Sequence, residues 1–528
     1  MKNYLSKISF MVLIALLALS CGKKEVMSEP IWEGATAVLY ANIGQMHTKS
    51  GLAEMNLTKL EQELDQNIEE GKEKMATIIK SMLRNPNASG FNLNEPIYFA
   101  VGEYVNDDNK YNVIASVEVE SATTVDDFLK AIAEDFTNAN FTIKGNKRII
   151  SDVEEGVIIG YDDNRLVAIG TNDKSCDLQS VLLNHMKYDA ADLSRFQDYD
   201  LAAYLDINNV YGLTHTLNTN DSNEESDEDV DLFEYFDKKA SVITGLSFDQ
   251  GCITYNANIN GVSENISKLF KELNGRSLNR LAASPIALLD IGINGEAFAE
   301  LANVAIDTTM ESLGGASNEF NIYKNIALGV IASINGDLML SLTDAEGTIS
   351  ENVFGDKQIL FTSADALFTA NVTDNYIMDN IATYAGAFLT KQDNGYSIEA
   401  FGNRLTIAQD DNLFFVGVNN DGKTKQNSAA SQEWFSNILG RYVYAMVDFN
   451  QLFKSGYGRT ALNVMLNGIK NSTEKESATK LISSIDTASI TVSGNDEAMS
   501  GELMIVARDK SKNSLHSIVE LYYDIAFN

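Results

Sequence analysis

The chain has 528 residues, of which 45% are hydrophobic, and its 40 basic and 74 acidic residues give a net charge of −34. A field of that sign repels phosphate backbones, so the composition argues against nucleic acid as a partner. The chain is long enough for two or more domains, and its four prolines argue against long unfolded tracts.

The amino terminus has the pattern of an export signal. Lys2 and Lys7 form a positive start, and the apolar run 8–20 ends directly at Cys21. The run has 13 residues, whereas a helix needs about 20 apolar residues to cross a bilayer. It therefore predicts a cleaved signal and not a membrane-spanning helix.

The residues around the cysteine resemble a lipobox, because small Ser20 stands directly before it, although Ala18 replaces the usual leucine. We predict that residues 1–20 are a lipoprotein signal peptide and that Cys21 carries the acyl chains, palmitate among them. Residues 21–33 would form a tether. An ordinary secretory peptide with a coincidental cysteine is the alternative.

The rest of the chain is predicted to be two tandem copies of one unit, with a period of about 245 residues. The clearest match is a hairpin with Asp-Asp-Asn at its turn, in residues 157–170 and 405–417. Asn and Asp tolerate the left-handed conformation of a tight turn. We predict a first repeat over 34–281 and a second over 282–528.

Three further segments match in the same order in the two halves. They are 39–44 with 287–292, 113–120 with 367–374, and 204–211 with 446–453.

Each copy is predicted to run strand, long helix, two strands, helix, four short strands, helix, strand, and then a final hairpin and helix. Residues 52–83 have apolar side chains at helical spacing, and 113–119 alternate as in a half-buried strand. Hairpins dominate, so the fold class is α+β with mainly antiparallel sheets.

An acidic run over 221–231 has no counterpart in the second half. Carboxylates can bind Ca²⁺, but a calcium loop starting at Asp221 would need glycine at 226 and glutamate at 232, where Ser226 and Leu232 stand. A solvated surface loop is the favoured interpretation, and weak cation binding stays open.

Residues 417–424 match the spacing of a phosphate-binding loop after an apolar strand. The apolar strand 444–448, which ends at Asp448, would correspond to the acidic strand of a nucleotide site. Such a loop opens an amphipathic helix, yet 425–431 are polar and loop-like. The counterpart 170–175 lacks the second glycine, and Asp206 repeats Asp448. We therefore predict a surface loop and no nucleotide.

No other motif nominates a catalytic, metal or cofactor site. The four histidines are scattered, and the two Ser-x-x-Lys matches, 472–475 and 477–480, overlap one polar helical stretch. Cys176 and Cys252 can pair in an oxidising compartment, although two buried thiols are favoured.

The aspartate and asparagine pairs Asp206/Asn208 and Asp448/Asn450 are predicted to cap the helical turns that follow their strands.

The lipobox, the opening strand with Asn-Ile-Gly at 42–44 and the Asp-x-Asn segments after two strands resemble an uncharacterised family of Bacteroidota lipoproteins, domain of unknown function 4836. The resemblance would cover the mature chain and implies no activity. Gly22-Lys23-Lys24-Glu25 resembles the signal that sends such lipoproteins to the cell surface. The expected location is the outer membrane, with the surface face favoured.

We therefore expect a lipid-anchored, non-enzymatic binding or accessory module of the envelope, with a protein or glycan partner and no cofactor. The alternatives are an envelope or polymer-degrading hydrolase and a structural spacer. A glycoside hydrolase needs two catalytic carboxylates, and among 74 acidic residues the sequence does not single out a pair.

Overall fold

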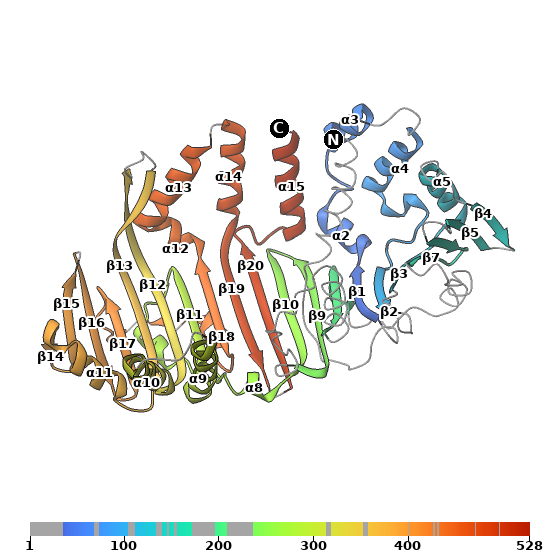
Figure 1. The fold of residues 1–528 in the computed structure, drawn as a ribbon. Helices are drawn as coiled ribbons and strands as arrows, with labels where there is room; N and C mark the ends of the chain where they lie inside the picture. The colour runs from blue at the N-terminus through green and yellow to red at the C-terminus, as the bar shows by residue number, and fades with distance from the viewer. Residues whose placement is uncertain are drawn as a thin grey trace. The chain divides into compact units, whose positions relative to one another are not determined.

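The computed structural model describes residues 35–67, 73–103, 111–133, 140–144, 147–152, 156–171, 196–207, 236–312, 318–351, 357–400, 402–425, 428–429, 432–469, 471–495 and 497–527. These residues form two compact units (Figure 1). Unit 1 comprises Met1–Asp231, Phe236–Gly261 and Asp509–Asn528, and unit 2 comprises Leu232–Tyr235 and Val262–Arg508. The predicted repeat boundary at 281/282 stays a prediction.

Unit 1 is built on a sheet in which every pairing with a determined register is antiparallel. In spatial order its strands are β4 (Asn140–Lys144), β5 (Lys147–Asp152), β6 (Val157–Tyr161), β7 (Arg165–Thr171), β3 (Tyr111–Glu118), β2 (Ile97–Glu103), β1 (Ala35–Ala41), β8 (Leu201–Asp206), β9 (Phe236–Asp249) and β10 (Cys252–Val262). Its helices are α2 (Ile43–Ser50), α3 (Thr58–Asn67), α4 (Glu73–Arg84), α5 (Ala122–Ala133) and α15 (Ser514–Phe527), with the 3-10 turn η1 (Pro86–Ser89).

Unit 2 has a second antiparallel sheet. Its strands, in spatial order, are β14 (Thr390–Gln392), β15 (Gly395–Ala400), β16 (Asn403–Asp410), β17 (Leu413–Val418), β13 (Lys357–Val372), β12 (Ile334–Glu351), β11 (Ala287–Asn294), β18 (Val443–Asp448), β19 (Ile485–Gly494) and β20 (Ala498–Ala507). Its helices are α8 (Glu264–Ser267), α9 (Gly295–Ser312), α10 (Asn318–Ala332), α11 (Tyr376–Tyr384), α12 (Phe449–Lys454), α13 (Gly456–Gly468) and α14 (Ser472–Ser484), with the 3-10 turns η4 (Arg276–Arg280), η5 (Gly386–Phe388) and η7 (Glu433–Asn437).

The two sheets have the same topology. In each, the first strand lies between the second and the eighth, and the third lies between the second and the seventh. The four short strands form a meander at one edge, and strands eight to ten follow at the other. The α+β class, the antiparallel sheets and this succession of strands are as the sequence predicts.

Two hairpins show why the Asp-Asp-Asn turns recur. In unit 1 the Asp162 carboxylate accepts hydrogen bonds from the amides of Asn164 (2.9 Å) and Arg165 (3.2 Å). In unit 2 Asp411 has a φ of 49°, in the left-handed region that short polar residues tolerate. Both turns join paired strands, β6 to β7 and β16 to β17.

The helix expected over 52–83 is confirmed in part, because α3 and α4 lie in this span, but residues 52–57 are not helical. Helix α2 ends at Ser50, because Gly51 adopts a φ of +68° that terminates the helix, and α3 begins only at Thr58. The Asn56 side chain accepts hydrogen bonds from the amide and the hydroxyl of Thr58 at the start of α3. The apolar spacing therefore extended the expected helix into the turn that separates α2 from α3.

The carboxyl-terminal helix α15 belongs to unit 1, although the second half of the sequence supplies it. It packs on α2 and β9. The His516 imidazole is hydrogen-bonded to the Ser50 carbonyl oxygen (Nδ1 to O, 2.8 Å), and Asn513 donates to the Phe248 carbonyl (2.8 Å). The last residues of the chain therefore complete the unit that its first strand begins.

Candidate functional site

The central strands of unit 2 carry two rows of apolar side chains across one sheet face. Strand register places the first row on β12, β11, β18, β19 and β20, as Leu340, Leu289, Ala445, Ile490 and Leu503. The second row begins on β13 and runs Ala366, Leu342, Ala287, Val447, Ala488 and Ile505. Because side chains alternate along a strand, all eleven lie on the same face.

This face is open to solvent, whereas the opposite face is covered. Leu340, Ile490 and Leu289 are 54%, 46% and 38% exposed. On the other face Leu288, Met339 and Leu367 are buried under a cluster that includes Leu278, Leu281 and Ile438. The sheet therefore has one ordinary core face and one bare apolar face.

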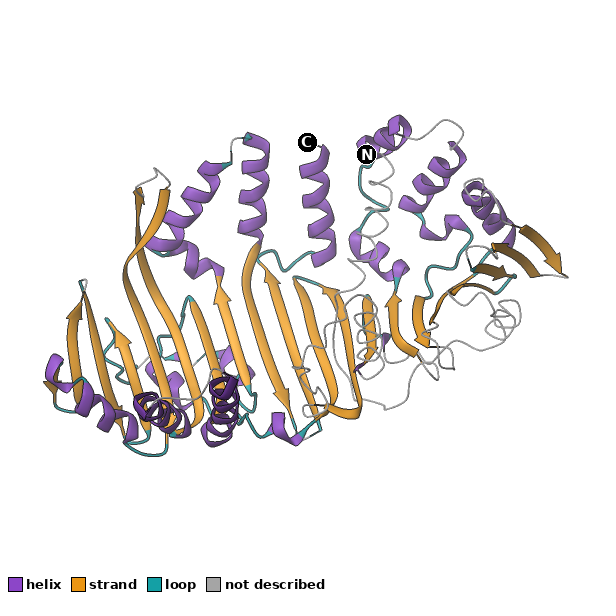
Figure 2. Cartoon of the chain, viewed as in Figure 1, coloured by secondary structure: helices purple, strands orange, loops and turns teal. Residues whose placement is uncertain are grey.

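All side chains of the two rows except Ile505 line a cavity of about 470 Å³, which we call the apolar groove. Its lining is Ala287, Leu288, Leu289, Leu340, Ser341, Leu342, Ala366, Ala445, Met446, Val447, Ala488, Ser489, Ile490 and Leu503. Figure 2 shows the middle of these strands uncovered, with α9 and α10 at one end and α12 to α14 at the other. Helices α10 and α13 pack on β12, so helices bound the groove at both ends.

Unit 1 carries a similar, smaller apolar face. Leu39 on β1 pairs with Phe99 and Ala203, and Ala37 pairs with Leu205. Phe99 and Leu205 are 40% and 39% exposed. Ala203 on the same face is buried, as are its neighbours on β8, so the corresponding face of unit 1 is only partly open.

Two carboxyl groups lie on the covered face behind the groove. Asp290 on β11 and Asp337 on β12 are fully buried, and they lie diagonally across adjacent strands. Burial, and then the charge on Asp337, raise the pKa of Asp290 to about 8. Burial also raises the pKa of Asp337, although its carboxylate accepts hydrogen bonds from the amides of Asn274 (3.1 Å) and Gly275 (2.8 Å). These hydrogen bonds hold residues 274–275, which lead into the segment that covers the core face with Leu278 and Leu281.

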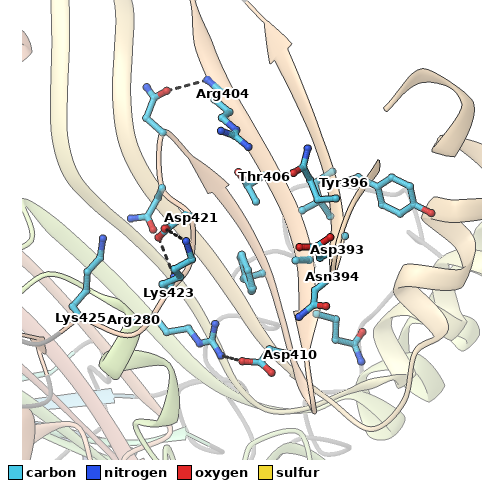
Figure 3. A pocket seen from close by; sticks show the side chains of 18 residues that line it. Arg280, Asp393, Asn394, Tyr396, Arg404, Thr406, Asp410, Asp421, Lys423 and Lys425 are labelled. Atoms are coloured by element: carbon cyan, nitrogen blue, oxygen red, sulfur yellow. Dashed lines mark hydrogen bonds and ion pairs between the residues drawn. The ribbon is translucent and has the colours of Figure 1, made fainter. Parts of the chain in front are cut away.

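A larger, polar cleft of about 840 Å³ lies where β15, β16 and the 419–425 loop meet (Figure 3). Four of the charged side chains that line this cleft form ion pairs with each other. Arg280 forms an ion pair with Asp410 at 2.6 Å, and Lys423 forms one with Asp421 at 3.0 Å. The apolar groove differs from this cleft, because its lining has almost no polar side chains and no charged ones.

The loop that matches a phosphate-binding motif borders this polar cleft. Three of its amides already donate within the protein: Asn419 to the Arg404 carbonyl (2.8 Å), Gly422 to the Asn420 side chain (3.0 Å) and Lys423 to Asp421 (3.1 Å). Over its described residues no helix begins. Because these amides are already hydrogen-bonded within the protein, they are not available to bind a phosphate.

Of the predicted capping residues, Asp448 behaves as expected. It is the N-cap of α12, and its carboxylate accepts a hydrogen bond from the Gln451 amide at 2.9 Å. Asn450 instead donates to Asp486 from inside the helix, so its predicted capping role is wrong. Asn208 lies outside the described residues, so the cap predicted for Asp206 and Asn208 stays a prediction.

The predicted lipid attachment at Cys21, the tether 21–33 and the acidic loop 221–231 all lie outside the described residues. Cys252 is half-buried and Cys176 lies outside the described residues, so the interpretation of the two as buried thiols stays a prediction. Within the described part of the chain, no group of three or more His, Cys, Asp or Glu residues is placed to hold a metal ion. Nor does any helix there have the length and apolar character to cross a membrane.

The sequence interpretation missed the apolar groove, although a signal for it exists. Residues 443–447 read Val-Tyr-Ala-Met-Val and 338–342 read Leu-Met-Leu-Ser-Leu, so both faces of these strands are largely apolar. An antiparallel strand with one solvated face is expected to alternate with polar residues. The absence of polar residues on the second face of these strands was the sequence signal for an apolar surface.

Strand β3 shows the related ambiguity. Val113 and Ala115, taken from the sequence as its core face, are only half-buried, whereas Ile114 and Ser116 are buried.

Fold and site together define a class: an α+β protein of two antiparallel-sheet units of the same topology, with a bare apolar groove on the second. The chain belongs to the family described as "Domain of unknown function (DUF4836)", whose model matches residues 30–515.

No curated protein matches the chain. Among solved structures the chain is similar to "Structure of crystal form I of TP0453", with 9% identity over 75% of this chain and 93% of that one. The TM-score is 0.18, so this likeness carries no argument about fold or function.

Proposed function

We propose that this protein is an exported lipoprotein, anchored to the outer membrane through Cys21, that acts as a non-enzymatic binding module. The export signal and the lipobox support the anchor, and the resemblance to Bacteroidota lipoproteins supports the location. The matching topology of the two sheets supports their origin by duplication of one unit.

The observation that carries the binding role is the apolar groove. Leucine and isoleucine side chains that are about half exposed leave much of their transfer free energy unused, roughly 25 cal/mol for each Å² of apolar area. A ligand that covers the two rows would recover it. Contiguous apolar area of this kind marks binding surfaces.

The test is binding of an environment-sensitive apolar dye to the mature chain carrying Cys21→Ser, which removes the lipid. Leu340→Thr and Ile490→Thr keep residues that favour strands while shrinking and polarising the groove. Each should weaken dye binding severalfold.

The matched control is Ile349→Thr. Ile349 lies on the same strand, β12, is 51% exposed and lies outside the two rows. An equal loss of binding in this control, or no dye binding by the unsubstituted chain, would refute the groove as a binding site. Circular dichroism of each variant checks that the fold is kept.

A further inference from the structure

The lining of the apolar groove offers a ligand almost no hydrogen bonds. Ser341 and Ser489 supply its only side-chain hydroxyls, and the other twelve residues are alanine, valine, leucine, isoleucine and methionine. The Ser341 hydroxyl already donates to the Leu367 carbonyl at 3.2 Å. A polar group placed here would lose its hydration and gain no hydrogen-bond partner, which disfavours binding. The ligand should therefore be hydrocarbon where it touches the groove.

The backbone under the groove is also fully used. Strand β11 pairs with β12 and β18, β12 pairs with β11 and β13, and β19 pairs with β18 and β20. An extended peptide needs a free strand edge to satisfy its amides and carbonyls. No such edge exists among these three strands, so a peptide added as a strand does not suit the site.

The dimensions of the groove favour a slim ligand over a helix. Its volume of about 470 Å³ falls within the range of small-molecule sites. A ten-residue helix, about 15 Å long and 10 Å wide, occupies on the order of 1,200 Å³. The lining of the groove comes from six neighbouring strands, β13, β12, β11, β18, β19 and β20, and at about 4.8 Å between neighbours these extend over on the order of 24 Å. The site is long, narrow and apolar.

We infer that the ligand of the apolar groove is a long-chain fatty acid, whose single acyl chain lies along the two rows and whose carboxylate stays in solvent. This inference rests on the proposed binding function and names its ligand class. The chain would cover Leu340, Leu289 and Ile490, the side chains of the first row that are most exposed.

The experiment uses the mature chain with Cys21→Ser and a fluorescent long-chain fatty acid as the probe. Saturable binding is expected, with displacement by unlabelled palmitate and none by butyrate, whose short chain covers only part of the rows. The Leu340→Thr/Ile490→Thr double variant should bind about tenfold more weakly, because each lost methylene contact costs about 0.8 kcal/mol. Ile349→Thr should bind as the parent does.

Each contrary outcome identifies what fails. If the apolar dye binds but palmitate does not displace it, the fatty-acid inference is overturned and the proposed binding role stands. If neither the dye nor the fatty acid binds, both the proposed binding role and the fatty-acid inference are refuted.

Two further measurements identify other occupants. Binding of the fatty acid only when it is carried in phosphatidylcholine vesicles would assign the groove to a membrane surface and overturn the inference. Sedimentation that shows a dimer, abolished by the double variant, would assign the groove to a second copy and overturn it equally.

Discussion

Asp290 is a fully buried carboxyl of unit 2 whose pKa is raised by burial. Its pKa is raised from 3.8 to about 8, so between these values the folded chain binds more protons than the unfolded chain. The free energy of unfolding should therefore fall as pH rises through this window, by up to about 1.4 kcal/mol per pH unit. Asp290→Asn should flatten that dependence and stabilise the protein most at the alkaline end.

Urea unfolding at about pH 5 and about pH 8 measures the effect. The control is Asp393→Asn, since Asp393 is an exposed carboxyl of the same unit. Parallel pH profiles for the parent and Asp290→Asn would contradict the assignment.

Asp448 acts locally, as the sequence predicted. Its carboxylate satisfies the Gln451 amide at the start of α12, so Asp448→Ala should cost about 1 kcal/mol of stability. Asp448→Asn, which keeps an oxygen acceptor, should cost less. Chemical unfolding of the two variants tests the cap, and an equal loss in both would argue for a role of the charge itself.

Short-range roles such as these are predictable from sequence, because donor and acceptor lie within three residues of each other. The perturbation of Asp290 is not, since it comes from burial and from Asp337, a residue 47 positions away that strand pairing brings near.

At the scale of elements, α15 shows that order along the chain does not decide membership of a unit. The sequence places this helix at the end of the second repeat, yet it packs on α2 and β9 of unit 1. Deleting 509–528 should therefore destabilise unit 1 and leave unit 2 nearly unchanged. Hydrogen exchange should rise in α2 and β9 and stay constant in β18 and β19.

Gly51→Ala is the matched point variant for this contact. Gly51 has a φ of +68°, and an added Cβ would lie 2.4 Å from the His516 ring. Backbone strain of about 1–2 kcal/mol and this clash should loosen the same helix. Faster exchange in unit 2 than in unit 1 would refute the assignment of α15.

The apolar strands of unit 2 also show what element-level patterns leave open. A largely apolar strand indicates that both faces need cover, but it does not say whether a helix, another chain or a ligand provides it. The exposed fractions of Leu340 and Ile490 show only that the described part of the chain leaves this face uncovered.

At the scale of the whole molecule, the anchor and the body are separable. Cys21→Ser should leave the circular dichroism spectrum and melting temperature unchanged while releasing the protein into the soluble fraction of cells. Fractionation and palmitate labelling measure this. A variant that stays with the membranes would show that another part of the chain anchors it.

Taken alone, the sequence determined the α+β class, the antiparallel hairpins and the order of strands in each half. It could do so because alternation, turn chemistry and helix caps are local properties. It also supplied the export and lipid-attachment prediction, which depends on a linear motif.

Only the tertiary structure decided which unit holds α15, which face of the unit 2 sheet is bare and where the apolar groove lies. These depend on contacts between residues far apart in the chain and on how much water remains at each side chain. The same leucine pattern serves a core or a binding surface, and packing alone separates the two.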